Sequence, residues 1–147
     1  MKRKIILLAG PTASGKTKIA IKLAQKINGE IINTDSMQVF KDFQILSSRP
    51  NKNELKLAKH HLYGFQSSGA IFSTGKWLKL AENKIRQITK KGKVPILVGG
   101  TGLYFKAITD GISKIPNIKS TDRNKIRNLH KKIGQKKFYE RLIKLDP

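Results

Sequence analysis

The sequence predicts an α/β fold with a parallel sheet, and three observations support this. Short apolar runs at residues 4–9 and 94–98 suit strands buried on both faces, because neither run alternates with polar residues. Two other segments, 16–27 and 76–91, repeat apolar residues at helical spacing. Strands that alternate with helices predict parallel strands joined by right-handed crossovers.

Smaller signals complete the predicted core. The Asn-Gly pair at 28–29 favours a left-handed cap that ends the first helix. A second strand is expected at 30–33, a short helix at 54–59 and a further helix at 103–109. Because three strands make only a small sheet, the α/β core of residues 1–113 is predicted to be incomplete.

The character of the chain changes after residue 113. Residues 115–117 (Ile-Pro-Asn) predict a hinge, and two amphipathic helices should follow it. Their expected buried residues are Ile126, Leu129 and Ile133 in the first helix, and Phe138, Leu142 and Leu145 in the second. Residues 114–144 carry 11 Lys or Arg against two acidic residues. Residues 114–147 are therefore predicted to be a basic helical segment, the start of an insertion domain.

Composition excludes some functions and favours others. The 147 residues include 31 Lys or Arg and nine Asp or Glu, a formal net charge of +22. This excess favours a polyanionic partner, because each neutralised phosphate releases a condensed counterion; a scattered bias toward lysine is the alternative. With no cysteine, disulfides and thiolate metal sites are excluded. No apolar run is long enough to cross a bilayer and no cleavage site follows the short apolar start, so we expect a cytoplasmic protein without a membrane partner. We also expect a monomer.

A phosphate-binding P-loop is predicted between the first strand and the first helix. Residues Gly10 to Thr17 read Gly-Pro-Thr-Ala-Ser-Gly-Lys-Thr, and they stand in the strand-to-helix context that the motif requires. Backbone N–H groups and the helix N-terminus should bind phosphate, while Lys16 supplies a cation and Thr17 a hydroxyl for Mg²⁺. The loop predicts a three-layer, P-loop NTPase-like fold and, taken alone, suggests a nucleotide such as ATP.

Two further strand ends should lie at the same edge of the sheet, where ligands of parallel sheets bind. Asp35 follows the second strand and is the acid best placed to face the phosphate; capping the turn with Ser36 is its other possible role. The third strand runs into Gly-Gly-Thr-Gly at 99–102, without the Mg²⁺-binding aspartate that is usual in ATPases and GTPases. One carboxylate and two glycine-rich strand ends around a phosphate site favour group transfer.

Four blocks in this order resemble the signatures of the tRNA dimethylallyltransferase family. They are Gly10–Thr17, Asp35–Phe40 (Asp-Ser-Met-Gln-Val-Phe), His60–Leu62 and Leu97–Tyr104 (Leu-Val-Gly-Gly-Thr-Gly-Leu-Tyr). The second and fourth blocks are far more specific than the P-loop. The resemblance covers nearly the whole chain, while the family's downstream blocks are missing, so a member truncated at its C-terminus is expected.

The resemblance implies transfer of a dimethylallyl group from dimethylallyl diphosphate to the exocyclic amine of the adenine beside the anticodon of tRNA. Lys16 and Mg²⁺ would stabilise the departing pyrophosphate, Asp35 would act as general base, and Thr101 would reach the donor's bridging oxygen or the tRNA. The donor-binding residues would be Gly10, Pro11, Thr12, Ala13, Ser14, Gly15, Lys16 and Thr17, with Thr17 also binding the metal. The tRNA contacts, including a pocket for a flipped adenine, would be Asp35, Ser36, Met37, Gln38, Thr101 and Arg123.

Two other functions stay open from the residues alone. A P-loop kinase of a small metabolite would use Asp35 to activate a hydroxyl, but it leaves the net charge and the 97–104 block without a role. An inactive remnant would bind RNA through its charge only. The adjacent His60 and His61 lack a third metal ligand, so no catalytic role is predicted for them.

Overall fold

The computed structural model describes residues 4–113 and 118–147. The chain divides into two compact units, Met1–Ile112 and Ser113–Pro147. The predicted hinge at 115–117 lies outside the described residues.

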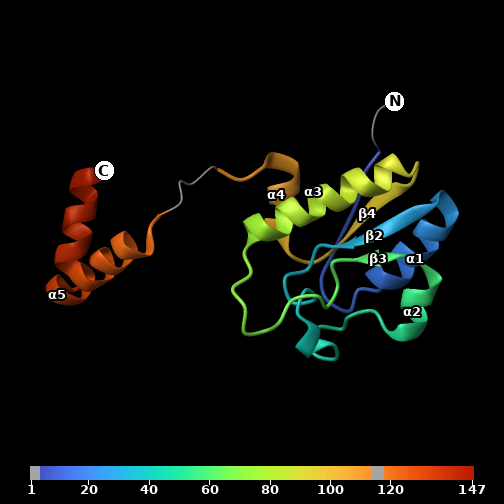
Figure 1. Cartoon of the computed structure of the whole chain (residues 1–147), viewed down its shortest axis with the longest axis horizontal. Helices are drawn as coiled ribbons and strands as arrows, with labels where there is room; N and C mark the ends of the chain where they lie inside the picture. The colour runs from blue at the N-terminus through green and yellow to red at the C-terminus, as the bar shows by residue number, and fades with distance from the viewer. Residues whose placement is uncertain (1–3, 114–117) are drawn as a thin grey trace. The chain divides into compact units, whose positions relative to one another are not determined.

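The first unit is a four-stranded parallel sheet with helices packed against it (Figure 1). In spatial order its strands are β1 (Ile6–Ala9), β4 (Val94–Gly99), β2 (Gly29–Asn33) and β3 (His60–His61). Its helices are α1 (Lys16–Ile27), α2 (Lys52–Leu57), α3 (Thr74–Lys90) and α4 (Gly102–Asp110), with a short 3-10 helix η1 (Lys41–Phe43). The predicted α/β fold is confirmed, and β3 adds a fourth strand to the three expected.

The central strands are buried on both faces, which gives this unit three layers. In β2, Ile31 packs with the core on the α1 side, whereas Ile32 packs with the core on the α3 and α4 side. In β4, Ile96 and Leu97 divide between the same two cores. Trp77, which is fully buried, anchors α3 on the second face. The continuous apolar runs in the sequence therefore reflect strands covered on both sides.

Local caps explain where two helices begin and end. Asn28 takes the predicted left-handed conformation (φ 52°) after α1, and its N–H donates to the carbonyl of Ala24. Asn51 and Glu54 form a capping box at the start of α2. This box explains why α2 begins at Lys52, before the start expected at residue 54.

The second unit contains α5 (Ser120–Leu145), which Gly134 interrupts with a φ of 76°. The two helical stretches match the two predicted helices, but the predicted burial is wrong. No described residue of α5 is buried, and Ile126, Leu142 and Leu145 are 53%, 50% and 84% exposed. Two short stretches joined at a glycine share too little surface to bury both apolar faces. No helix among the described residues is long and apolar enough to cross a membrane.

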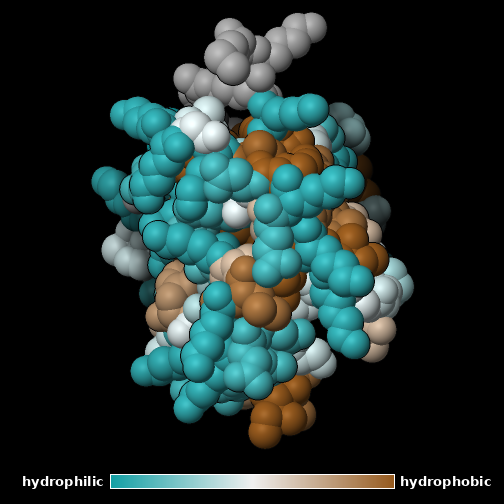
Figure 2. All heavy atoms as spheres, turned by 90° about the vertical axis from the view of Figure 1, so that its right-hand side faces the viewer, coloured by the Kyte–Doolittle hydropathy of each residue, from teal (hydrophilic) through white to brown (hydrophobic). Residues whose placement is uncertain are grey.

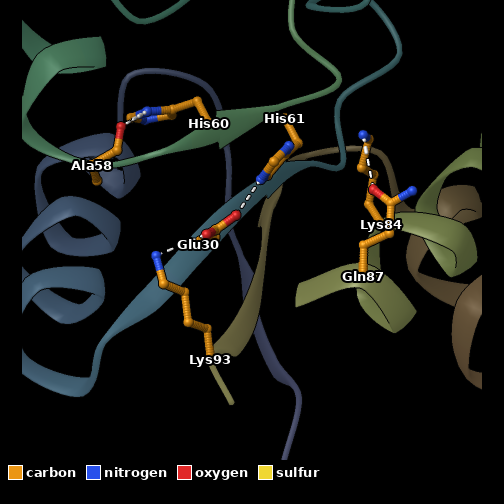
Figure 3. A network of polar contacts seen from close by, with 7 residues as sticks. All are labelled: Glu30, Ala58, His60, His61, Lys84, Gln87 and Lys93. Carbon is orange, nitrogen blue, oxygen red and sulfur yellow. Dashed lines mark hydrogen bonds and ion pairs between the residues drawn. The ribbon is translucent and has the colours of Figure 1, made fainter. Parts of the chain in front are cut away.

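A buried carboxylate joins three strands of the sheet (Figure 3). Glu30 on β2 is 1% exposed; one oxygen lies 2.6 Å from Nε2 of His61 on β3, and the other 2.9 Å from Nζ of Lys93, next to β4. Burial opposes the ionisation of Glu30, but hydrogen bonds with Lys93 and His61 outweigh burial and lower its pKa. His61 therefore holds the short strand β3 against β2.

Replacing Glu30 with Gln should lower the free energy of unfolding by about 2–3 kcal/mol at neutral pH, because it removes the buried negative charge that binds Lys93 and His61. Chemical denaturation measures this, and Glu82→Gln on the exposed face of α3 is the control. The pKa of Glu30 is lowered from 4.5, so its contribution is present above that value and is lost as the pH falls through the folded pKa. The two proteins should therefore become equally stable in acid; a constant difference would contradict the ionic role.

Candidate active site

Three chain segments meet at the carboxyl ends of β1, β2 and β4. Gly99 packs so closely against the turn after β2 that a Cβ there would lie 2.1 Å from the carbonyl oxygen of Thr34, which only glycine permits. The N–H of Gly10, at the start of the P-loop, donates to the carbonyl of Gly99 at 3.3 Å. The P-loop, the turn at 34–38 and the loop at 99–102 are therefore neighbours.

The P-loop connects β1 to α1 in a conformation suited to an anion. Ala13 (φ 61°) and Gly15 (φ 79°) are left-handed, and Gly15 is the N-cap of α1 without any side-chain cap. The helix N-terminus thus keeps its positive partial charge for a ligand. Lys16 folds back over the loop, where its ammonium group donates to the carbonyl of Pro11 and to Oγ of Ser14.

Asp35 lies in the turn after β2 with a fixed orientation. Its Oδ1 accepts the N–H of Met37 at 2.9 Å, and its Oδ2 would lie 3.7 Å from a Cβ placed on Gly100. The side-chain amide of buried Asn33 binds both the N–H and the carbonyl of Asp35, at 3.0 and 2.9 Å. Burial and the negative charge of Asp35 raise the pKa of the Tyr104 hydroxyl. Asp35 thus caps its turn through one oxygen while the other points toward the glycine-rich loop.

Thr101 connects the loop after β4 to the turn after β2. Its Oγ1 accepts the N–H of Ser36 at 2.9 Å and lies 3.3 Å from the hydroxyl of Ser36. Its own N–H donates to the carbonyl of Thr34 at 3.3 Å. These bonds fix the positions of the Ser36 and Thr101 hydroxyls relative to the carboxylate of Asp35.

Two pockets open on either side of Asp35. The phosphate-side pocket has a volume of about 330 Å³ and is lined by residues 12–18, Asp35, Gln38, Ser48 and Glu54. The acceptor-side pocket has a volume of about 460 Å³ and is lined by Pro11, Thr12, Asp35, Ser36, Met37, Leu46, Ser47, Gly100 and Thr101. Only Thr12 and Asp35 line both. A group that moves from an anion in one pocket to an acceptor in the other would pass this carboxylate.

Some of the predicted site residues do not line the pocket in which they were expected. Gln38, expected beside Ser36 and Met37, lines the phosphate-side pocket instead, and its amide donates to the carbonyl of Ser47 at 2.9 Å. Gly10 lines neither pocket; a Cβ there would approach the Ser14 hydroxyl to 3.2 Å, so its role is close packing of the loop. Arg123 belongs to the second unit, where it is exposed in α5.

Outside the glycine-rich loop at 99–102, whose Gly100 also lines a pocket, sequence reasoning missed five lining residues. They are Lys18, Leu46, Ser47, Ser48 and Glu54. Only Lys18 carried a usable signal, since it directly follows the P-loop motif. The other four lie in or near the loop between η1 and α2, whose path depends on tertiary contacts such as the bond from Arg49 to the carbonyl of Phe40.

Residues 38–147 match the family model described as IPP transferase. The chain belongs to this family. It is 61% identical over 144 residues to the tRNA dimethylallyltransferase of Pelagibacter ubique and 49% identical over 145 residues to that of Rickettsia massiliae. These matches cover 98% and 99% of the chain, but 46% and 40% of the relatives. The chain therefore spans about half the length of the relatives it matches.

Solved structures of the family share its fold. The full-length tRNA isopentenylpyrophosphate transferase from Bacillus halodurans is 33% identical with a TM-score of 0.75, over 99% of this chain and 48% of that one. A eukaryotic dimethylallyltransferase acting on tRNA is 31% identical with a TM-score of 0.76, over 85% of this chain and 32% of that one. The family resemblance and the P-loop NTPase-like fold inferred from the sequence are confirmed.

The P-loop geometry predicts how the chain binds inorganic pyrophosphate. Lys16→Ala should weaken this binding at least about tenfold, because the loop loses the cation nearest its N–H groups. Isothermal titration calorimetry measures the affinity, and Lys22→Ala, on the exposed face of α1 outside the pocket, is the matched control. Equal losses in both variants would indicate attraction by net charge alone.

Proposed function

We propose that the chain forms the donor and acceptor site of a tRNA dimethylallyltransferase. The reaction moves a dimethylallyl group from dimethylallyl diphosphate to the exocyclic amine of the adenine next to the anticodon. The observation that carries the proposal is the position of Asp35 between a P-loop pocket and a second pocket. The names of the relatives, tRNA dimethylallyltransferase, support the same substrates.

The proposed step breaks one bond and forms another. The bond from the allylic carbon to the diphosphate oxygen breaks, and its electron pair leaves with pyrophosphate. The N–H groups of the P-loop and Lys16 stabilise the growing charge on this leaving group. The exocyclic nitrogen bonds to the same carbon and gives its proton to Asp35, the general base. Thr101 is proposed to contact the bridging oxygen or the adenine from the acceptor side.

Mg²⁺ is the proposed cofactor, with Thr17 as its protein ligand. The described residues include no group of three or more His, Asp or Glu able to hold a metal alone. Mg²⁺ commonly binds through one or two protein oxygens together with substrate phosphates, and Thr17 and Asp35 are oxygen donors lining one pocket. The ion would neutralise charge on the diphosphate.

The net charge of +22 supports tRNA as the acceptor. Hydrophilic side chains cover much of the face in Figure 2, which shows the side of the first unit where α1 and α2 lie in Figure 1. In the second unit, we propose that Arg123, exposed in the first turn of α5, contacts an RNA phosphate. A kinase acting on a small metabolite would have no use for this excess of positive charge.

An apolar rim beside Asp35 suits an unstacked adenine. Met37 and Leu46 are 51% and 86% exposed, yet both line the acceptor-side pocket. A base flipped out of its stack needs such apolar surface against its ring.

Leu46→Ser should therefore weaken binding of an unmodified anticodon stem-loop about tenfold, by loss of apolar contact with the base. Fluorescence anisotropy measures the affinity. Ile45→Ser is the control, since Ile45 is 91% exposed and does not line the pocket. Equal effects in the two variants, or none, would remove Leu46 from the acceptor site.

The function is tested by incubating the chain with labelled dimethylallyl diphosphate, Mg²⁺ and unmodified tRNA. Label should enter the tRNA, and Asp35→Asn should slow transfer at least about 100-fold while pyrophosphate affinity stays within about threefold. Asparagine can still accept the N–H of Met37, so the turn is preserved. Equal loss of binding and transfer would contradict the general-base role.

Other outcomes of the same assay discriminate between functions. ATP-dependent phosphorylation of a small metabolite, with no label in tRNA, would favour the kinase. Salt-sensitive RNA binding without any transfer would favour the RNA-binding remnant.

A further inference from the structure

The last residue of β2 places a polar side chain in the interior of the sheet. Asn33 is fully buried, as are Ile31 and Ile32 before it. A buried amide destabilises a fold unless its hydrogen-bonding groups find partners. The NH2 group of Asn33 donates to two carbonyls, that of Asp35 at 2.9 Å and that of Leu62 at 3.0 Å. Its oxygen accepts the N–H of Asp35 at 3.0 Å, so one amide joins the Asp35 turn to a second part of the chain.

The bond to Leu62 reaches the segment that follows β3. Leu62 comes directly after His61, which pairs with Ile32 and binds the buried carboxylate of Glu30 (Figure 3). Leu62 has a φ of 63°, and a residue other than glycine keeps this left-handed conformation only where its surroundings hold it. The carbonyl that Asn33 binds therefore belongs to a firmly held strand end.

The same segment also binds the other end of the Asp35 turn. The N–H of Gly64 donates to the carbonyl of Gln38 at 2.9 Å. Segment 62–64 thus holds the turn through Asn33 before Asp35 and through Gln38 after it.

We propose that Asn33 is the positioning residue for the general base Asp35, with the end of β3 as its anchor. Asn33 lines neither pocket, so it acts on the reaction through Asp35. Without the amide, both backbone groups of Asp35 lose their partner and the carboxylate loses its fixed direction. This inference rests on the proposed function, and it gives the His60–Leu62 block a role that the motif alone did not supply.

The kinetic test follows transfer of label from dimethylallyl diphosphate to unmodified tRNA by Asn33→Ala. The value of kcat should fall at least about 30-fold, while KM for dimethylallyl diphosphate stays within about threefold because the P-loop is untouched. Asn33→Ser is the milder variant, since its hydroxyl is too short to bridge the two carbonyls, and kcat should fall at least about tenfold.

Ile88→Val and Ile88→Ala control for lost stability. Ile88 is buried in α3, about 16 Å along the helix from Trp77. At a drop in melting temperature equal to that of the Asn33 variants, the Ile88 variants should keep kcat within about twofold. An equal loss of kcat in the two sets, or an unchanged kcat in Asn33→Ala, would overturn the inference.

A double substitution separates positioning from a general effect on the fold. In the Asp35→Asn background, Asn33→Ala should lower kcat by less than about twofold, because no base remains to be misplaced. The same fold-loss in both backgrounds would contradict an action through Asp35.

Hydrogen exchange supplies a measurement that needs no catalysis. The N–H of Met37, which Oδ1 of Asp35 accepts, should exchange at least about tenfold faster in Asn33→Ala than in the unsubstituted chain, and at an unchanged rate in Ile88→Val. Unchanged exchange in Asn33→Ala would overturn the inference. If the unsubstituted chain transfers no label, the proposed function fails, and the exchange rates still decide whether Asn33 orders the turn.

Discussion

At the ends of β2 and β4 the backbones of Thr34 and Gly99 lie too close together for any side chain to stand between them. The carbonyl of Thr34 accepts the N–H of Thr101, and the carbonyl of Gly99 accepts the N–H of Gly10. Three loops therefore leave the sheet within hydrogen-bond reach of one another. A side chain at position 99 would force the turn after β2 away from β4, which would separate Asp35 from both the P-loop and the glycine-rich loop.

The hydrophobic core extends this constraint to the carboxylate itself. Trp77 is fully buried, stacks on Tyr104 with ring centroids 4.2 Å apart, and donates its indole N–H to the carbonyl of Asn33. The side chain of Asn33 in turn binds both backbone groups of Asp35. The packing of α3 therefore helps to fix the backbone position of Asp35, which lines both pockets. Such fixed orientation suits the general-base role proposed for Asp35, since proton transfer depends first on geometry and then on pKa.

Local patterns determine which parts of this arrangement the sequence could predict. The P-loop, α1 and β4 follow from motif and periodicity, because each depends on contiguous residues. The strand β3 has only two residues, and it is held by pairing with β2 and by the contact of His61 with buried Glu30, which join distant parts of the chain. The position of Leu46 in the acceptor-side pocket likewise depends on how its loop folds back. The exposure of the apolar residues of α5 could not be predicted, because an amphipathic pattern shows which face of a helix is apolar but not which element covers that face.

The P-loop and the turn that carries Asp35 depend on the same strand end. Gly10 follows the last residue of β1, and its N–H donates to the carbonyl of Gly99 at the end of β4. Gly99 also packs directly against the backbone of Thr34, one residue before Asp35. The end of β4 therefore sets the position of the P-loop and of Asp35 together.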